Sequence, residues 1–191
     1  MCDTGVASMG YFYFDFKDTS KQSARALLTS LLVQRSAQSD ACCDTLSRLY
    51  SVYEAGSKQP SDDALRECLR DMLASPGQGP IFIVVDALDE CPQSTGTPSP
   101  RERVLNLVKW LANLHYSPLH LCVTSRPEAD IQVVLQKLAS HMVSLHSESG
   151  QMEDIKNYIN FFIKTDESTR KWRKQDQELV ICKLSEQAGG M

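Results

Sequence analysis

The fold class is decided by one stretch of this 191-residue chain: Ile81-Phe82-Ile83-Val84-Val85-Asp86-Ala87-Leu88-Asp89-Glu90. Its first five residues form a continuous apolar and mostly β-branched run, which is typical of a central strand in a parallel sheet. Turn-forming residues precede the run, and three acidic residues follow it closely. The stretch therefore predicts a buried strand that brings carboxylates to one edge of an α/β sheet.

Further strands and helices are expected on both sides of this stretch. Apolar runs predict three more strands, at residues 11–16, 119–124 and 142–145. Apolar residues at helical spacing predict helices at residues 24–38, 46–50, 61–73, 100–112, 131–138, 155–163 and 179–190. The segment Ser99-Pro100-Arg101-Glu102 combines an N-cap, a proline at the first helical position and a capping-box glutamate. Alternating strands and helices predict a three-layer α/β fold, with a mainly parallel sheet and helices on both faces.

Composition excludes several classes of function. Twenty Lys and Arg residues against twenty-four Asp and Glu give a net charge of -4, which provides no basic groove for nucleic acid. The seven cysteines are odd in number and form no C-x-x-C pair, so neither a disulfide framework nor a zinc site is expected. No stretch approaches the roughly eighteen uninterrupted apolar residues of a transmembrane helix. We therefore expect a cytoplasmic protein with no membrane span and no nucleic-acid partner.

The acids at the end of the 81–85 strand are candidates for metal and phosphate chemistry. Ligands of open α/β sheets bind beyond the carboxyl ends of the strands, where a carboxylate can hold Mg²⁺ against nucleotide phosphates. Asp86 is the candidate metal ligand. Asp89 or Glu90 could orient or deprotonate a water for attack on the terminal phosphate. The alternative is that Asp89 and Glu90 cap the turn that follows.

A second group of candidates follows the 119–124 strand, which ends in Thr124, Ser125 and Arg126. Its carboxyl end is expected beside the acids. An arginine there can bond a phosphate oxygen and sense the terminal phosphate, while the hydroxyls position water or the loop. The alternative is a surface salt bridge between Arg126 and either Glu128 or Asp130.

Three segments together carry a family resemblance: Tyr11-Phe12-Tyr13-Phe14-Asp15-Phe16, Asp86-Ala87-Leu88-Asp89-Glu90-Cys91 and Thr124-Ser125-Arg126-Pro127-Glu128. In this order they resemble the NACHT domain, within the signal-transduction NTPases (STAND type) of the P-loop class. The similarity is closest to large fungal NOD-like receptors, whose domain is also described as a nephrocystin-like N-terminal NACHT domain. It covers residues 11–191 and leaves residues 1–10 as a disordered or non-native N-terminus.

The resemblance implies a role for each candidate residue. Residues 81–90 correspond to the Walker B element, with Asp86 at the metal and with Asp89 and Glu90 in catalysis. Residues 119–126 correspond to the sensor strand, with Thr124, Ser125 and Arg126 toward the nucleotide. Intact relatives bind Mg²⁺ with ATP or GTP, and the nucleotide controls self-association in signal transduction and innate immunity. Effector and repeat domains flank the NACHT domain in those relatives.

The phosphate-binding loop of that family does not occur in this sequence. P-loop NTPases require Gly-x-x-x-x-Gly-Lys-Ser/Thr, the Walker A motif. Gly5 and Gly10 have the glycine spacing, but Tyr11-Phe12 follows where lysine and a hydroxyl residue belong. Comparison with the family places the missing strand and loop upstream of Met1, so we expect a partial domain with little activity. For this chain alone, the alternatives are a weak Mg²⁺ and nucleotide site or no cofactor at all.

Two further functions compete with this interpretation. The first is a non-catalytic protein-interaction scaffold, in which nucleotide is irrelevant. The second is a Mg²⁺-dependent nuclease or phosphatase built on Asp86, Asp89 and Glu90, which the acidic net charge disfavours. The nucleotide interpretation makes a structural prediction: strands 11–16, 81–85 and 119–124 form one contiguous sheet, and strand 142–145 is separated from it by a gap. It also places the largest concavity near Asp86 and Arg126.

Overall fold

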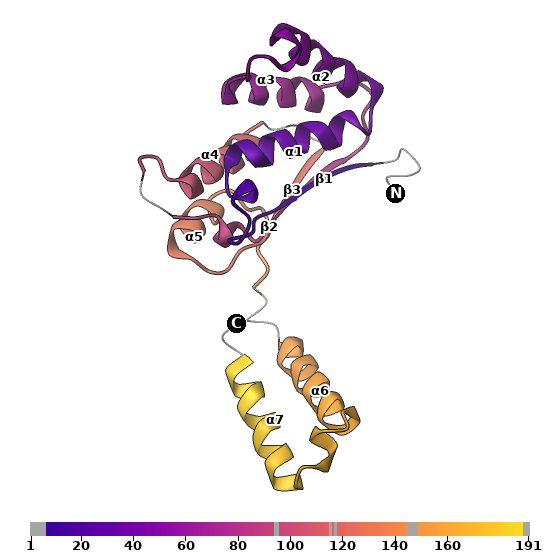
Figure 1. Cartoon of the computed structure of the whole chain (residues 1–191), viewed down its shortest axis with the longest axis vertical. Helices are drawn as coiled ribbons and strands as arrows, with labels where there is room; N and C mark the ends of the chain where they lie inside the picture. The colour runs from indigo at the N-terminus through magenta and orange to yellow at the C-terminus, as the bar shows by residue number, and fades with distance from the viewer. Residues whose placement is uncertain (1–6, 94–95, 115, 117, 145–148, 189–191) are drawn as a thin grey trace. The chain divides into compact units, whose positions relative to one another are not determined.

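The computed structural model describes residues 7–93, 96–114, 116, 118–144 and 149–188 of the chain (Figure 1). The chain forms two compact units, residues 1–139 and residues 140–191, where the sequence predicted one domain over residues 11–191. In the second unit, the helices pack against each other.

The first unit contains a parallel sheet and five helices among its described residues. Its strands are β1 (Ser8–Tyr13), β2 (Ile81–Asp86) and β3 (Leu119–Val123). Its helices are α1 (Ala24–Ser36), α2 (Asp40–Val52), α3 (Asp62–Leu73), α4 (Pro100–Ala112) and α5 (Ala129–Leu135). Three short 3-10 turns complete it: η2 (Thr19–Lys21), η3 (Glu54–Gly56) and η4 (Leu88–Glu90).

Several predicted bounds need correction: α2 begins at Asp40 rather than at residue 46, and β1 ends at Tyr13 rather than at residue 16. β1 begins at Ser8 rather than at residue 11, so residues 8–10 belong to the sheet and not to a disordered N-terminus. The fourth strand expected at residues 142–145 is wrong for residues 142–144, which adopt no regular structure, and residue 145 lies outside the described part. Met142 and Val143 are exposed, and an apolar pair of this length is too short to hold a strand without a partner.

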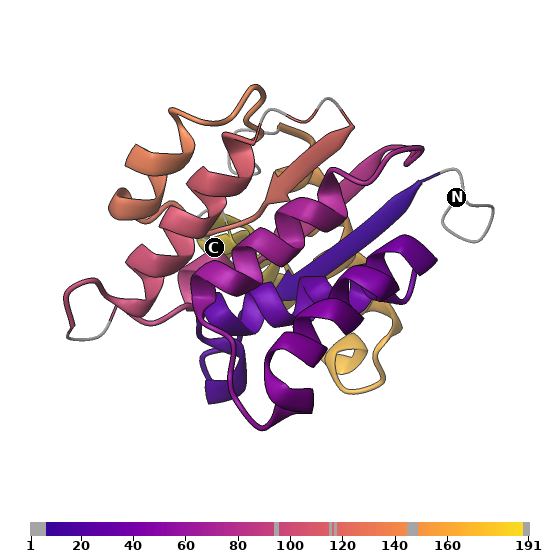
Figure 2. The same ribbon diagram turned by 90° about the horizontal axis from the view of Figure 1, so that it is seen from above.

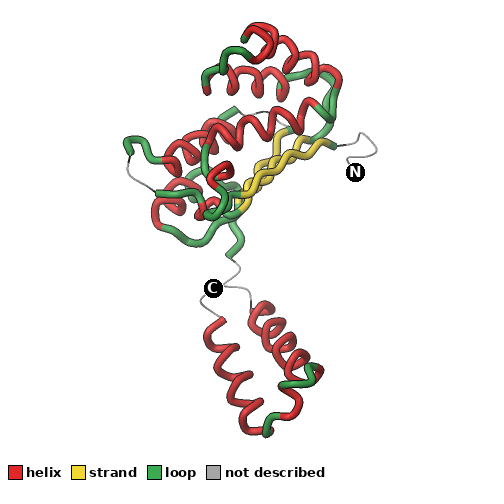
Figure 3. The backbone as a smooth tube through the Cα atoms, in the orientation of Figure 1, coloured by secondary structure: helices red, strands yellow, loops and turns green. Residues whose placement is uncertain are grey.

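The three strands form one contiguous parallel sheet, as the sequence predicted, and their order is β1-β2-β3 (Figure 3). Tyr13 of β1 lies opposite Asp86 of β2, and Val85 lies opposite Val123 of β3. Within the described residues, β3 pairs with β2 and has no strand on its other side. The register places the carboxyl ends of all three strands at one edge.

Helices cover one face of this sheet. Helices α1 and α4 lie on one side of the strands (Figures 1 and 2). Ile81, Ile83 and Val85 of β2 are fully buried in the core that also contains residues of α1 and α4. Residues of the opposite face are exposed, with Tyr11 at 54% and Phe82 at 41%. The described part of the first unit therefore has helices over one face, where the sequence analysis expected them over both.

Side-chain caps explain where the helices begin. Ser23, Ser61 and Ser99 each precede a helix and accept a hydrogen bond from the backbone N–H three residues later. Such caps satisfy N–H groups that have no partner within the helix, and each stabilises the helix by about 1 kcal/mol. Pro100 occupies the first position of α4, so this start was correctly predicted from the sequence.

Two glutamines close the outer edge of β1. The side chain of Gln38, just after α1, bonds both the N–H and the C=O of Met9, at 3.1 and 2.6 Å. Gln34 of α1 bonds the same groups of Tyr11, at 2.9 and 2.7 Å. Four helical residues rise about 6 Å and two strand residues about 6.6 Å, so the spacings match. The amides thus satisfy an edge that would otherwise attract another strand.

The second unit is a helical hairpin of α6 (Ser149–Thr165) and α7 (Lys174–Ala188), joined through the turn η6 (Thr169–Lys171). Asp166 caps this turn by accepting hydrogen bonds from the backbone N–H groups of Ser168 and Thr169. Hydrogen bonds from Ser168 hold the pKa of Asp166 below its ordinary value. Gln177 of α7 donates to the Thr169 carbonyl at 3.1 Å and fixes the return of the chain.

Candidate functional site

The carboxyl edge of the sheet brings together the acidic and hydroxyl residues that the sequence singled out. Asp86 is the last residue of β2 and is exposed, and Thr124 directly follows β3. The Thr124 hydroxyl donates a hydrogen bond to Asp86 Oδ1 and accepts one from the Ala87 N–H at 3.0 Å. The two strand ends are therefore joined through side chains as well as through the sheet.

The turn after Asp86 depends on an unusual backbone conformation. Ala87 adopts φ +53° and ψ +46°, the left-handed region that costs a residue with a Cβ atom about 1 kcal/mol. The reversal directs the chain into η4, where the Leu88 side chain is fully buried in the core. Backbone strain of this kind is found at functional sites, where surrounding structure holds it in place.

Asp89 holds the loop that carries Arg126. Its Oδ1 accepts the Arg126 N–H at 3.0 Å, and its Oδ2 lies 3.6 Å from Arg126 Nε. The Asp89 side chain is 10% exposed, whereas the Arg126 side chain is 79% exposed. From the sequence, Glu128 or Asp130 was the alternative salt-bridge partner of Arg126. In the structure, the partner is Asp89.

Glu90 makes the corresponding connection to the loop after β1. Its Oε2 accepts the N–H of Phe16 at 3.2 Å. Gln22 supports the same loop by donating to the carbonyls of Asp15 and Phe16, at 3.0 and 2.8 Å. Asp89 and Glu90 thus each bind backbone of a neighbouring loop, instead of capping the turn that follows them.

Ser125 is part of the loop without facing the acids. Its hydroxyl donates to the Arg126 carbonyl at 2.8 Å, a contact within its own loop. Of the hydroxyls proposed for this site, Thr124 is the one that the structure joins to Asp86. Ser125 therefore shapes the backbone beside Arg126.

A second cation lies at the end of β1. Lys21 donates a hydrogen bond to the Tyr13 hydroxyl, and its ammonium lies 3.7 Å from the centre of the Tyr13 ring. The hydrogen bond to Tyr13 raises the pKa of Lys21, so the ammonium stays charged. Because Tyr13 is in register with Asp86, this edge carries positive as well as negative groups.

Sequence reasoning missed Arg101, which lies beneath the acidic turn with only 8% of its surface exposed. Its guanidinium donates to the carbonyls of Asp89 and Cys91, at 2.6 and 2.9 Å, and pairs with Asp130 at 3.5 Å. A sequence signal existed, because the first turn of a helix favours acidic residues and Arg101 places a cation there. An arginine in that position needs partners outside the helix.

Cys91 is a structural thiol. Burial raises its pKa to about 11, and its Sγ donates to the Gln22 carbonyl at 3.5 Å. A protonated, buried thiol is neither a nucleophile nor a metal ligand at neutral pH. The site's chemistry must therefore come from its carboxylates, hydroxyls and guanidinium groups.

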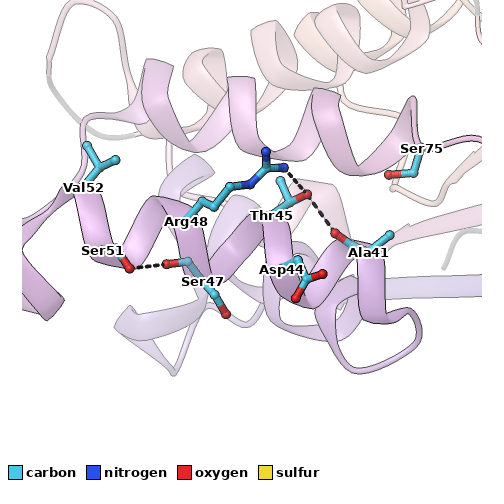
Figure 4. Close-up of a pocket in the computed structure, with 8 residues that line it drawn as sticks. All are labelled: Ala41, Asp44, Thr45, Ser47, Arg48, Ser51, Val52 and Ser75. Carbon is cyan, nitrogen blue, oxygen red and sulfur yellow. Dashed lines mark hydrogen bonds between the residues drawn. The ribbon is translucent and has the colours of Figure 1, made fainter.

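Two pockets of the first unit lie away from the carboxyl edge of the sheet, and the concavity expected near Asp86 and Arg126 stays a prediction. An open pocket of about 950 Å³ lies along α2 and the end of α3 (Figure 4). It is lined by Ala41, Asp44, Thr45, Ser47, Arg48, Ser51, Val52 and Ser75. A smaller apolar pocket of about 240 Å³ lies between α1 and α2. At the carboxyl edge, the side chains of Asp89 and Glu90 each accept a backbone N–H of a neighbouring loop.

A metal ion would find one carboxylate here rather than a complete cage. Across the described ranges, no cluster of three or more His, Cys, Asp or Glu residues could hold a metal. Mg²⁺ is usually bound through one or two carboxylates while it keeps several waters and contacts substrate phosphates. Asp86 with Thr124 fits that partial donor set. None of the described helices is both long and apolar enough to cross a bilayer.

Comparison with known proteins identifies the family. The family model described as "Nephrocystin 3, N-terminal" matches residues 2–126, which is more than half of the chain. The match extends from before β1 to Arg126 and contains every residue predicted for the site. No curated protein and no solved structure matches the chain. The chain thus belongs to the nephrocystin 3 N-terminal family.

Proposed function

We propose that the carboxyl edge of this sheet binds the Mg²⁺ complex of a nucleoside triphosphate. The observation that carries the proposal is the exposed Asp86 at the end of the central strand, bonded to Thr124 and close in the chain to the Asp89–Arg126 pair. In open α/β sheets this is where ligands bind. On this proposal, the chain is a partial nucleotide-binding core of a NACHT-type signalling NTPase.

Asp86 has the capacity to hold the metal. An ionised carboxylate offers about four lone-pair positions, and Thr124 uses one of them on Oδ1. The remaining positions can bind Mg²⁺ directly or through its waters. The Thr124 hydroxyl fixes the direction of the carboxylate, which reduces the entropy lost when the ion binds.

Arg126 supplies the opposite charge for the phosphates. Its contact with Asp89 is made by the backbone N–H and by Nε, and the side chain is 79% exposed. A guanidinium presents five N–H donors in a planar fork that suits phosphate oxygens. Arg126 can therefore contact a phosphate while its backbone stays fixed by Asp89.

This sequence contains no Gly-x-x-x-x-Gly-Lys-Ser/Thr motif, and this determines how tightly we expect the chain to bind a nucleotide. In P-loop NTPases that loop holds the phosphates through backbone N–H groups and a lysine. Without it, we expect weak binding of ATP or GTP and negligible hydrolysis. Nucleotide-controlled self-association, a cytoplasmic location, and flanking effector and repeat domains are the corresponding proposals for a longer NOD-like receptor of fungal type.

The test is the binding of Mn²⁺ in place of Mg²⁺, followed by electron paramagnetic resonance with and without ATP. The wild-type chain should bind Mn²⁺·ATP weakly, and Asp86→Asn should lose this binding. Asp63→Asn on α3 is the matched control, because that carboxylate is 91% exposed and remote in the chain. Micromolar binding that survives Asp86→Asn, or hydrolysis above background, would contradict the proposal.

Two observations favour a second function, that of a non-catalytic interaction scaffold. Asp86, Asp89 and Glu90 all accept hydrogen bonds from the chain itself, and aromatic residues are exposed on the sheet face. Equal binding of Mn²⁺·ATP by wild type, Asp86→Asn and Asp63→Asn would favour the scaffold. The nuclease or phosphatase alternative is not proposed, because Asp89 and Glu90 turn toward separate loops rather than toward one metal.

A further inference from the structure

We propose that Arg101 is a positioning residue of this site, acting through Asp89 on the exposed Arg126. The inference rests on the proposed function for its ligand, the phosphates of a nucleotide. The three residues form a relay of contacts: Arg101 of α4 contacts Asp89 of η4, and Asp89 contacts Arg126 in the loop after β3. Neither Arg101 nor Asp89 needs to touch the ligand in this relay.

The first step of the relay fixes the backbone of the acidic turn. Arg101 Nη2 donates to the Asp89 carbonyl at 2.6 Å, and Nε donates to the Cys91 carbonyl at 2.9 Å. The guanidinium is planar, so two donors at fixed spacing define where both carbonyls lie. With the Arg101 side chain itself buried, this backbone has little freedom to rotate.

The second step uses the side chain of the residue whose carbonyl is held. The Asp89 carboxylate faces Arg126 with both oxygens, one on the backbone N–H and the other 3.6 Å from Nε. An arginine that is 79% exposed would normally sample many rotamers. Asp89 restrains it at Nε and leaves the end of the fork toward solvent.

The third contact of Arg101 reaches the other end of the same loop. Its Nη1 lies 3.5 Å from Asp130 Oδ1 in the first turn of α5, four residues after Arg126. Gln93 donates to the second oxygen of Asp130 at 3.4 Å. Arg101 therefore holds the loop of Arg126 from both sides, through Asp89 before it and through Asp130 after it.

The placement of Arg101 is costly for the helix and useful for the site. A cation in the first turn of α4 opposes the helix dipole, and burying it costs solvation. Its three contacts go to the Asp89 carbonyl, to the Cys91 carbonyl and to the carboxylate of Asp130. The network is also neutral, since Arg101 pairs with Asp130 and Arg126 pairs with Asp89. We conclude that Arg101 orders this edge of the sheet.

The experiment measures the order of the Arg126 Nε–Hε group by ¹⁵N heteronuclear NOE on the full chain, without any ligand. Wild type should show a restrained Nε, Arg101→Met should lower the NOE clearly, and Arg101→Lys should lie between them. Arg103→Met is the matched control, because Arg103 lies on the same helix and is exposed. Its Nε donates to the Pro98 carbonyl rather than to the site.

The same variants are then titrated with Mn²⁺·ATP. Arg101→Met should weaken binding about fivefold, the equivalent of one hydrogen bond, and Arg103→Met should leave it unchanged. If Arg101→Met fails to fold, Arg101→Lys and Asp130→Asn decide the matter through the same NOE. An unchanged Arg126 NOE in the folded variants overturns the relay. A lowered NOE with no nucleotide binding in wild type supports the relay and refutes the proposed function.

Discussion

Replacing Asp89 should mainly lower the stability of the fold, whereas replacing Asp86 should mainly abolish metal binding. Asp89 is 10% exposed and accepts a backbone N–H at 3.0 Å, a charge-assisted bond that contributes about 1.5–3 kcal/mol. Its ion pair with the exposed Arg126 adds about 0–1 kcal/mol. Asp89→Ala should therefore reduce the free energy of unfolding by about 2–3 kcal/mol. Asp86 is exposed and accepts one hydroxyl, so Asp86→Asn should cost under about 1 kcal/mol.

The assay is urea unfolding followed by the fluorescence of Trp110, which lies on α4 of the first unit. A Trp172→Phe background removes the second tryptophan, so that the signal reports one unit. With a slope near 2 kcal/mol per molar urea, Asp89→Ala should move the midpoint down by about 1–1.5 M. Mn²⁺·ATP binding should persist in Asp89→Asn, weakened about fivefold as in Arg101→Met, and disappear in Asp86→Asn. Equal destabilisation by both, or loss of Mn²⁺ binding in a folded Asp89→Asn, would refute the reasoning.

Three other predictions concern the core and its thiols. The buried Arg35 bonds Gln78 and has two unpartnered nitrogens, so Gln78→Ala should destabilise by about 1.5–3 kcal/mol, the loss of a hydrogen bond to a charged group, and Arg35→Met by about 1 kcal/mol or less, compared by urea midpoints. Gly10→Ala should cost about 1–3 kcal/mol in the same assay, since its Cβ would lie 2.9 Å from a leucine of α1. Burial raises the pKa of Cys91 and of Cys68 to about 11, above their ordinary 9.0. The unfolded chain then loses these protons first, so stability should fall between about pH 9 and 11, and less steeply in Cys91→Ala.

Local signals in the sequence were sufficient to locate the three strands of the first unit and the starts of α1, α3 and α4, but they missed the start of α2 at Asp40 by six residues. The apolar run at Ile81 and the serine before Pro100 each act within a few residues, so pattern reasoning locates β2 and α4 correctly. The division into two units depends on which helices pack their apolar faces against each other. A local sequence pattern does not contain this information. The strand expected near Met142 failed because a short apolar run needs a partner strand, and the described residues provide none there.

The candidate site shows the same limit at the level of side chains. The sequence places Asp86, Thr124 and Arg126 at strand ends, and parallel topology then brings them to one edge. The partners of Asp89 and Glu90 could not be inferred, because they are backbone N–H groups of distant loops. Arg101 was missed for a related reason: its acceptors are carbonyls, which carry no residue signature.

The three acids at the end of β2 accept hydrogen bonds from different types of donor, and this difference explains their different roles. Asp89 and Glu90 meet backbone N–H groups, which must be satisfied when a loop packs and therefore commit a carboxylate to structure. Asp86 meets a hydroxyl, which can rotate and accept as readily as it donates. A cation that binds Asp86 thus displaces no obligatory contact of the fold. Under the proposed function, Mg²⁺ can bind Asp86 and leave it without unfolding the surrounding loops, as the proposed nucleotide-controlled switch requires.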